Sequence, residues 1–517
     1  MAARPPAQPT AILRGHRAQV HSAVFMRLDQ TVASGATMTA DTRLATGDSD
    51  GYVVLWDLAI VRARAVWRAH KNSILGMAAW DDDRQLVTHG RDHRLVVWQV
   101  GVADEARLST VLPLDDESAA SSRPTSAKAS GETASRPQPW MVHVLEVNTM
   151  NFCAFAWSGL VGSVAAVEAA SVSAVGEPSS TDVAVATDAP APRERLLAVP
   201  NTLTLEAADL YHLPSQRRIN TIRLGTKEGM IMAMALFYAS APPAAPETLV
   251  LIAAFENGVV VLATLAHGAD GPATILYRAQ PHSQPILSLD VAPDRSYFLT
   301  SAADAVIAKH PIRVPAATRD MQQQSKQVST EASQTEFAPP SSAPPPRKPV
   351  SLLSAALAKD AAAPPSSALP RVPKPPPRAS APVEIETQPL ATTDTKHAGQ
   401  QGLRIRDDGR LYATAGWDAR VRVYSAQTMK EVAVLKWHQT GCFAVAFAPV
   451  TRADADGDAA PLATPTQEKD TADTRLVSRP NARREISVKE RRLRHAVTAH
   501  WLAAGSKDGK ISLWDIF

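Results

Sequence analysis

The sequence has few aromatic residues and few cysteines, and both shortages exclude classes of protein. Aromatic residues make up 5% of the 517 residues, while forty residues are prolines, an unusual ratio for one compact domain. The two cysteines, Cys153 and Cys442, are too few for a disulfide framework or for a zinc site with four thiolate ligands. This cysteine usage is typical of a reducing compartment such as the cytosol or the nucleus.

The chain also lacks a large charge excess and a long apolar run. Its 54 basic and 51 acidic residues give a net charge of +3, which argues against nucleic-acid binding by the whole surface. No apolar stretch of a secretory signal follows the first residues, and the longest apolar runs, 230–238 and 249–254, are shorter than the ~18 residues of a membrane span. We therefore expect a soluble intracellular protein without a membrane partner.

Four segments differ in composition from the rest and are predicted to be disordered insertions. They are rich in Ala, Ser, Pro or charged residues, so they bury too little apolar surface to offset the entropy of an ordered chain. Fifteen of the forty prolines fall between Pro339 and Pro389. The predicted insertions are residues 101–139, 161–193, 313–395 and 451–497.

A repeated pattern organises the remaining residues. Each copy has a short apolar strand, a turn with an aspartate, and an alternating strand that ends in tryptophan six residues after that aspartate. The clearest copies are residues 44–57 (LATGDSDGYVVLWD), 86–98 (LVTHGRDHRLVVW) and 502–515 (LAAGSKDGKISLWD). Alternation on both sides of such a turn indicates a β-hairpin. A histidine lies upstream of each copy, at His16, His70 and His438.

Weaker copies keep the same intervals. In residues 299–310, Asp304 is followed six residues later by His310, and His282 lies 22 residues before Asp304. In residues 412–424, Asp418 is followed by Tyr424, and His397 lies 21 residues before Asp418. Residues 251–263 and 196–211 keep less of the pattern. Seven units of about 45 residues result, the length of a four-stranded propeller blade.

With this spacing, and with the dipeptides Trp56-Asp57 and Trp514-Asp515, the sequence resembles the WD40 family. The resemblance implies an all-β fold, one seven-bladed β-propeller over residues 1–517 with long insertions. Pairing of the spare strand Ala11–Leu13 with the end of the chain is predicted to close the ring and remove exposed sheet edges. The predicted blades are residues 11–66, 67–100, 140–213, 214–265, 275–312, 396–428 and 429–517.

In the WD40 family, a His, a Ser or Thr, an Asp and a Trp of one blade form a buried hydrogen-bond chain. The resemblance implies two such tetrads, namely His16, Thr46, Asp50 and Trp56, and His70, Thr88, Asp92 and Trp98. A buried aspartate needs charge-assisted partners, which the histidine and the hydroxyl group supply. Blade seven has Ala504 at the hydroxyl position, so its chain is predicted to be broken there.

Three patterns that suggest chemistry are better explained by the blades. His89, Asp92 and His93 lie at a repeat turn, which favours a structural role over a metal or catalytic site. The segment 505–510 is one residue short of a phosphate-binding loop and lies between strands. His438 with Cys442 is only one pair of metal ligands. We therefore predict no catalytic, metal or cofactor site, no enzyme activity and no small-molecule substrate.

The residue before each turn aspartate points to one face in the WD40 family, and this face is the predicted partner surface. Because Arg and Trp are favoured at binding hot spots, Arg91, Trp417 and Lys507 indicate a surface for an acidic or extended peptide. A solvated turn explains the two cations equally well. An exposed Trp417 is harder to explain without a partner that covers it.

Two segments within the predicted insertions leave alternatives open. Residues 483–494 (RREISVKERRLR) carry six cations and two acids and fit either a nuclear-import or nucleic-acid patch or a solvated charged insertion. The runs PPPRKP (344–349) and KPPPR (374–378) fit an SH3-like groove, although a linker role explains them without further assumption.

Within the WD40 proteins, the sequence resembles the fungal ASTRA-associated protein 1 family, in blocks such as ILRGHRAQVHSAVF, WRAHKNSILGMAAW and AAGSKDGKISLWDIF. The resemblance implies a non-catalytic scaffold subunit of the ASTRA complex in the nucleus, with the cytoplasm as a second compartment. It also implies protein partners from that complex, a role in chromatin remodelling and a link to maturation of phosphatidylinositol-3-kinase-related kinases. The alternative is a propeller of another pathway, such as a substrate receptor of a ubiquitin ligase or a reader of histone peptides.

Overall fold

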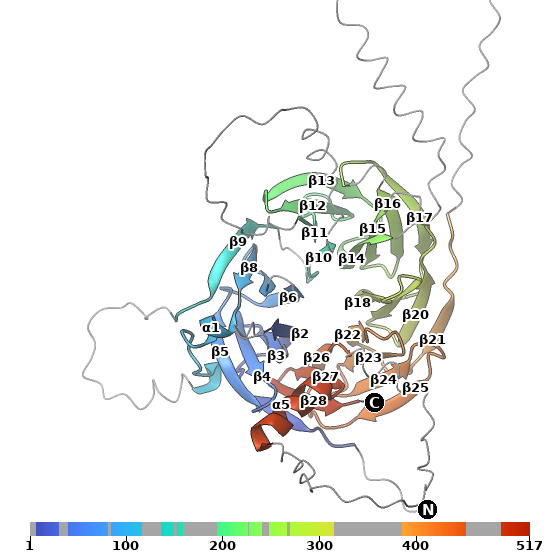
Figure 1. Cartoon of the computed structure of the whole chain (residues 1–517). Helices are drawn as coiled ribbons and strands as arrows, with labels where there is room; N and C mark the ends of the chain where they lie inside the picture. Colours follow the sequence, from blue (N-terminus) through green and yellow to red (C-terminus); the bar gives the residue numbers. More distant parts are fainter. Residues whose placement is uncertain are drawn as a thin grey trace, which may run out of the picture. The chain divides into compact units, whose positions relative to one another are not determined.

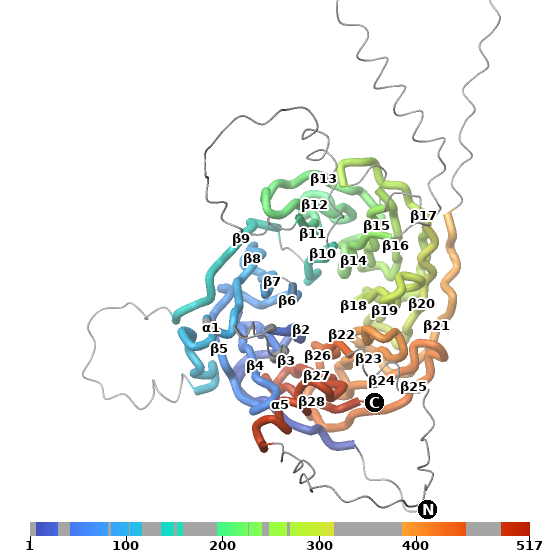
Figure 2. The backbone as a smooth tube through the Cα atoms, viewed as in Figure 1, coloured from blue at the N-terminus to red at the C-terminus, as the bar shows by residue number. Residues whose placement is uncertain are grey.

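A computed structural model describes residues 7–29, 40–80, 84–115, 136–148, 152–158, 194–225, 227–239, 248–265, 269–314, 385–450 and 487–516. The strands form seven antiparallel sheets of four strands each, arranged as blades around one axis (Figure 1). In each blade the first strand lies beside the axis and the last strand lies outside (Figure 2). The prediction of an all-β, seven-bladed propeller is confirmed. No helix in these ranges has both the length and the apolar character needed to cross a membrane.

Each blade runs from an innermost to an outermost strand. Blade one contains β2 (Val20–Asp29), β3 (Ala40–Asp48), β4 (Tyr52–Asp57) and β5 (Arg62–Arg68). Blade two contains β6 (Ile74–Trp80), β7 (Gln85–Gly90), β8 (Arg94–Gln99) and β9 (Trp140–Glu146). Blade three contains β10 (Ala156–Ser158), β11 (Arg195–Pro200), β12 (Ala207–Leu213) and β13 (Arg217–Arg223).

The other four blades follow the same order. Blade four contains β14 (Ile231–Ala239), β15 (Thr248–Phe255), β16 (Val260–Leu265) and β17 (Ala273–Ala279). Blade five contains β18 (Ile286–Val291), β19 (Tyr297–Ala302), β20 (Val306–Pro311) and β21 (Ala391–Asp394). Blade six contains β22 (Gln400–Ile405), β23 (Leu411–Gly416), β24 (Val421–Ser425) and β25 (Glu431–Leu435). Blade seven contains β26 (Cys442–Phe447), β27 (Trp501–Ser506), β28 (Lys510–Asp515) and β1 (Ala11–Arg14).

The hydrophobic core lies between the faces of neighbouring blades. The middle strands are buried on both faces, and every residue of β16 and β27 is buried. This burial explains why these strands are nearly continuous apolar runs rather than alternating ones. Between blades one and two, the buried rings of Trp67 and Trp98 meet edge to face with their centroids 6.0 Å apart.

The two ends of the chain close the ring, as the sequence predicts. Strand β1 pairs antiparallel with β28, with Ala11 opposite Leu513 and Arg14 opposite Lys510. The Thr10 N–H extends the pairing by donating to the Leu513 carbonyl at 2.8 Å. Blade seven therefore obtains its outer strand from the N-terminal part of the chain.

The predicted blade boundaries are wrong at the outer strands. Strand β9 pairs with β8 and completes blade two, although the prediction placed it in blade three. Strand β21 pairs with β20 and completes blade five from within the predicted insertion 313–395. Strand β25 likewise completes blade six, although the prediction placed it in blade seven. The repeat marks only the second and third strands, so the sequence does not show which blade the unmarked outer strand joins.

Parts of three predicted insertions are ordered, contrary to the prediction. The short helix α1 (Val102–Glu105) begins a segment whose Ser109 bridges to Val66 of β5, beside blade one (Figure 1). Glu386 forms a parallel bridge to Tyr277 of β17, at the outer edge of blade four. Both segments add main-chain hydrogen bonds to an outer strand, and the first also buries Leu108 in the core of blades one and two.

The third ordered part is the helix α5 (Val488–Thr498), within the predicted insertion 451–497. Ser487 caps it by accepting a hydrogen bond from the Glu490 N–H, and the Trp501 indole donates to the Ala496 carbonyl at 3.0 Å. The basic segment 483–494 is therefore helical from residue 488 onward. Residues 161–193, 315–384 and 451–486 lie outside the described residues, and both proline-rich motifs lie there with them.

Candidate functional site

A buried hydrogen-bond chain joins the strands of blade one. The Nδ1 atom of His16 lies 2.7 Å from a carboxylate oxygen of Asp48, and Nε2 lies 2.7 Å from the Thr46 hydroxyl. The Trp56 indole donates to the same hydroxyl at 2.8 Å. Since a carboxylate only accepts, Nδ1 donates to Asp48, and Nε2 accepts from Thr46. His16, Thr46 and Trp56 thus occupy their predicted places.

The prediction that Asp50 belongs to this hydrogen-bond chain is wrong, because Asp48 occupies the position of the aspartate. Asp48 is fully buried, whereas Asp50 pairs with Arg17 at 3.1 Å on the surface. The place of Asp48 is taken by Gly90 in blade two, where a Cβ atom would lie 2.4 Å from the His70 ring. Blade two thus leaves room for its turn aspartate, and blade one fills that room with Asp48 itself.

Blade two matches the predicted tetrad. His70 lies 2.9 Å from Asp92 and 2.7 Å from Thr88, and the Trp98 indole donates to Thr88 at 2.8 Å. Burial raises the pKa of Asp92, but hydrogen bonds from His70 and from the Lys71 N–H outweigh burial and lower that pKa below its usual value. The aspartate is therefore held as a carboxylate that ties the turn to the histidine.

Blade seven has a hydroxyl group after all, supplied by a neighbouring strand. Ser512 lies opposite Ala504 in the sheet and stands 2.8 Å from His438 Nε2, and it accepts from the Trp514 indole at 2.9 Å. The break lies instead at Asp508, which binds Lys510 at 2.5 Å and contacts Ser506 rather than His438. The predicted break at Ala504 is therefore wrong. The sequence pattern places the hydroxyl group on the second strand of a blade, whereas here it comes from the third strand.

We expect Ser512→Ala to destabilise the protein by about 1–2 kcal/mol, because His438 and Trp514 would both lose their buried partner. The midpoint of denaturant-induced unfolding measures this loss. The matched double variant Ala504→Ser/Ser512→Ala restores a hydroxyl group from the other strand and should recover part of the stability. An unchanged midpoint for Ser512→Ala would contradict the role of this hydroxyl group.

Blades five and six carry weaker copies of the repeat, and they differ in whether a buried hydrogen-bond chain forms. In blade five, His282 lies 3.1 Å from Asp304 and 2.8 Å from Thr300, and His310 replaces the tryptophan at 2.9 Å from Thr300. The chain continues to the Tyr277 hydroxyl, 2.8 Å from His310. In blade six, His397 is half exposed and 3.9 Å from Asp418, which binds Arg422 instead. The spacing between histidine and aspartate is therefore accompanied by the buried hydrogen-bond chain in blade five, but not in blade six.

His89 is buried in strand β7, which agrees with the structural role that the sequence analysis favours for it over a metal or catalytic site. Among the described residues neither ring nitrogen has a hydrogen-bond partner, and the ring meets Phe155 edge to face. Burial lowers the pKa of His89 to about 3, and the neighbouring His70 adds to this effect. Within the described ranges, no group of three or more His, Cys, Asp or Glu residues is placed to hold a metal ion.

We expect His89→Leu to stabilise the protein at pH 7 by about 1 kcal/mol, because it removes a buried polar ring that lacks partners among the described residues. Between pH 6.5 and about 3 the unfolded chain binds a proton at His89 that the folded chain does not, so stability falls as the pH falls. In the variant, the part of this pH dependence that His89 causes should disappear, which is up to about 1.4 kcal/mol of stability per pH unit. Unfolding midpoints between pH 4.5 and 7.5 test this, with His397→Leu as the exposed control. An unchanged pH slope would contradict it.

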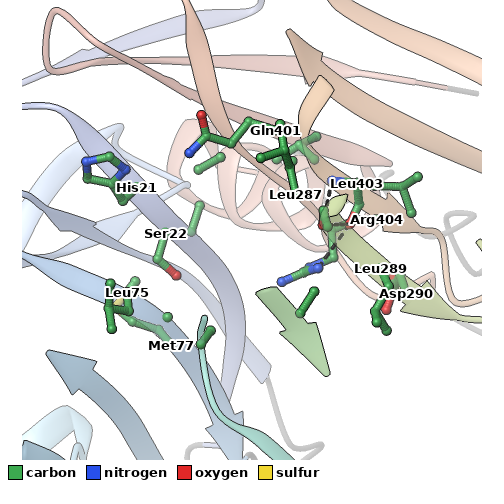
Figure 3. A pocket seen from close by; sticks show the side chains of 18 of the residues that line it. His21, Ser22, Leu75, Met77, Leu287, Leu289, Asp290, Gln401, Leu403 and Arg404 are labelled. Atoms are coloured by element: carbon green, nitrogen blue, oxygen red, sulfur yellow. Dashed lines mark hydrogen bonds between the residues drawn. The ribbon is translucent and has the colours of Figure 1, made fainter. Parts of the chain in front are cut away.

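A cavity of about 1320 Å³ follows the axis of the propeller between the inner strands of all seven blades. Figure 3 shows side chains from β2, β6, β18 and β22 around it, among them His21, Gln401 and Arg404. Four cations occur among the described residues that line it, Arg91, Arg295, Arg404 and Lys507, and one acid, Asp290. The charged side chains of the described lining are therefore mainly cationic.

All three predicted partner-face residues lie on the lining of this cavity. Arg91, Trp417 and Lys507 occupy the turns between the second and third strands of blades two, six and seven. Ser49, at the same turn of blade one, completes a row on four consecutive blades. The structure thus brings the three residues to one end of the channel, while their binding role stays a prediction.

Three aromatic or imidazole rings that the sequence reasoning missed lie beside these turns. Phe152 is 67% exposed, and the Arg91 guanidinium lies 4.5 Å above its ring centre. The rings of His21 and Phe443 stack with their centroids 5.4 Å apart and an angle of 6° between their planes. These residues lie on or before inner strands, where the repeat has no marker residue. We call Ser49, Arg91, Trp417, Lys507, His21, Phe152 and Phe443 the channel mouth.

Comparisons with known proteins agree with this architecture. The family described as "WD domain, G-beta repeat" matches residues 7–57 and 491–515, the two parts that contribute to blades one and seven. The chain is 44% identical to ASTRA-associated protein 1 of Pyricularia oryzae over 99% of its own length and 98% of the relative's. It is 36% identical to the protein of the same name from Aspergillus niger, over 99% and 98% of the two lengths. The chain therefore belongs to the ASTRA-associated protein 1 family, whose fold in this chain is a WD40 propeller.

Proposed function

We propose that this protein is a non-catalytic scaffold subunit of the ASTRA complex in the nucleus. The observation that carries the proposal is the full-length likeness to proteins named ASTRA-associated protein 1, which includes all seven blades. We extend the proposal to a role in chromatin remodelling and to the maturation of phosphatidylinositol-3-kinase-related kinases, as the resemblance in sequence implies.

The hydrogen bonds of the histidines and aspartates within the blades support a scaffold rather than an enzyme. The histidines of blades one, two and five are buried, and each is hydrogen-bonded to an aspartate and to a threonine of its blade. A general base or nucleophile needs access to a substrate. These groups instead fix the turns of their own blades, and the turns of blades one and two belong to the channel mouth. Rigid turns suit a binding surface.

Affinity purification of the tagged full-length protein from nuclear extract, followed by mass spectrometry, tests the proposal. We expect the ASTRA subunits to be recovered in stoichiometric amounts and to stay bound in moderate salt, with an untagged strain as control. Recovery of a ubiquitin-ligase adaptor, or of histones without ASTRA subunits, would overturn it in favour of the alternative pathways. Fluorescence microscopy of the tagged protein tests the nuclear location in the same strain.

A further inference from the structure

We infer that the helix α5 binds the phosphate backbone of a nucleic-acid duplex through the cations on its exposed side. As a sequence, the basic segment 483–494 fits an import signal, a nucleic-acid patch or a solvated insertion. The inference goes beyond the proposed function, which consists of contacts between proteins. It concerns the end of the blades opposite the channel mouth, because α5 lies in the connection from the first to the second strand of blade seven.

Helix α5 is fixed to the propeller where blades seven and one meet (Figure 1). Ala496 is buried and belongs, with Trp501, to the hydrophobic core between these blades. The His495 ring meets the Trp501 ring edge to face, with the centroids 5.3 Å apart. The helix also lies against β3 of blade one. Its exposed side chains therefore stand on a rigid support, so the backbone beneath them loses little entropy when a ligand binds.

Four cations lie on the exposed side of this helix, and none of them forms an ion pair or a side-chain hydrogen bond with another described residue. They are Lys489, Arg491, Arg492 and Arg494. Two acids balance part of this charge, Glu490 in the helix and Asp515, which lies 4.0 Å from His495. Several exposed arginines elsewhere are paired, Arg17 with Asp50, Arg64 with Asp57 and Arg313 with Glu386. The helix thus keeps an excess of positive charge for an anionic ligand.

The density of this charge favours a nucleic acid over an acidic peptide. A helix rises about 1.5 Å per residue, so the cations from Lys489 to Arg494 span about 7.5 Å of its axis. An extended peptide places the side chains of one face about 6.8 Å apart and offers about two carboxylates over this length. A duplex carries one phosphate charge per about 1.7 Å of its axis and offers about four. Three of the four cations are arginines, whose planar guanidinium matches phosphate oxygens.

The way in which α5 is held argues against a membrane surface and against a linear import signal. A helix that binds a membrane buries its apolar face in the lipid. In α5 that face is already covered, because Leu493 is half-buried and Ala496 is buried against the blades. Val488, in the first turn, is exposed. From residue 488 onward the segment is a folded surface rather than an extended chain, which disfavours recognition as a linear signal.

Fluorescence anisotropy of a short labelled DNA duplex, titrated with the full-length protein, tests the inference. We expect binding in the micromolar range at about 50 mM salt, and a salt slope of about −3 to −4 for about four phosphate contacts. Arg491→Ala/Arg494→Ala should weaken binding about tenfold or more and make this slope shallower by about 1.8. Arg491→Lys/Arg494→Lys keeps both charges and should keep the slope.

The matched control is Arg217→Ala/Arg223→Ala, which removes two exposed arginines from β13, the outer strand of blade three. It should bind the duplex as the unaltered protein does, and unfolding midpoints show that every variant is folded. The inference is overturned if the unaltered protein does not bind the duplex, or if the alanine variant of α5 binds as the control does. Binding of poly-glutamate as tight as that of the duplex would overturn it in favour of an acidic protein partner.

Microscopy of the tagged alanine variant of α5 separates this contact from nuclear import. Duplex binding as in the unaltered protein, together with loss of the nuclear location, would overturn the inference in favour of an import signal. Recovery of ASTRA subunits by the same variant tests the proposed function separately, since membership of the complex can hold while this contact fails.

Discussion

Asp48→Ala is expected to lower the free energy of unfolding by about 3–5 kcal/mol, the largest loss that we predict for one substitution. The Asp48 carboxylate is fully buried and accepts from His16 at 2.7 Å, from the Tyr52 N–H at 2.9 Å and from the Asp50 N–H at 3.0 Å. Alanine would leave these donors without their acceptor, and the His16 side chain is fully buried, so its ring would lose its partner away from water. Denaturant-induced unfolding, followed by tryptophan fluorescence, measures the loss.

Asp50→Ala is the matched control, two residues away in the same turn. Asp50 pairs with Arg17 on the surface, where an ion pair contributes about 0–1 kcal/mol. We therefore expect a change of less than about 1 kcal/mol for this variant. Equal losses for the two variants, or a larger loss for Asp50→Ala, would contradict the assignment of Asp48 to the buried chain.

The contrast between Asp48 and Asp50 shows how far the sequence alone can go. Counting back six residues from Trp56 finds the turn, and the hairpin around it is correct in the structure. The count does not show which of two nearby carboxylates enters the blade, because that depends on whether a side chain or a glycine stands two residues before the turn aspartate. The role of Ser512 was not predicted for a related reason. Its hydroxyl group replaces the one that Ala504 lacks, and it does so from the neighbouring strand of the sheet.

The same limit applies to the outer strands and to the channel mouth. An outer strand such as β9 or β21 has one partner and a half-exposed face, so its residues need no fixed pattern. The predicted residues Arg91, Trp417 and Lys507 were identified from their place in the repeat. Phe152 and Phe443 lie in or beside connections that the repeat does not mark, and only the closed ring brings them to the same opening.

Glu105→Ala is expected to destabilise the protein by about 3 kcal/mol and to loosen residues 101–115 from blade one. Glu105 and Arg43 are both buried and form a two-pronged ion pair, with Arg43 Nε 2.9 Å and Nη2 3.3 Å from the two carboxylate oxygens. Asp57 lies 3.8 Å from the same guanidinium and is also bound by Arg64. Without Glu105, the buried Arg43 would lose both of its short contacts with this carboxylate, and the Asp57 carboxylate is more distant and shared with Arg64.

Hydrogen exchange measured by mass spectrometry locates this effect. Amides of residues 102–115, and the Val66 N–H that donates to Ser109, should exchange faster in Glu105→Ala, while those of blade four should not change. The double variant Arg43→Met/Glu105→Leu replaces the ion pair by apolar side chains and should recover most of the stability. Unchanged exchange over 102–115 in Glu105→Ala would show that the Ser109 bridge holds the segment without the ion pair. The expected result would show that a buried pair of charges, together with the buried side chain of Leu108, orders a segment that was predicted from its composition to be disordered.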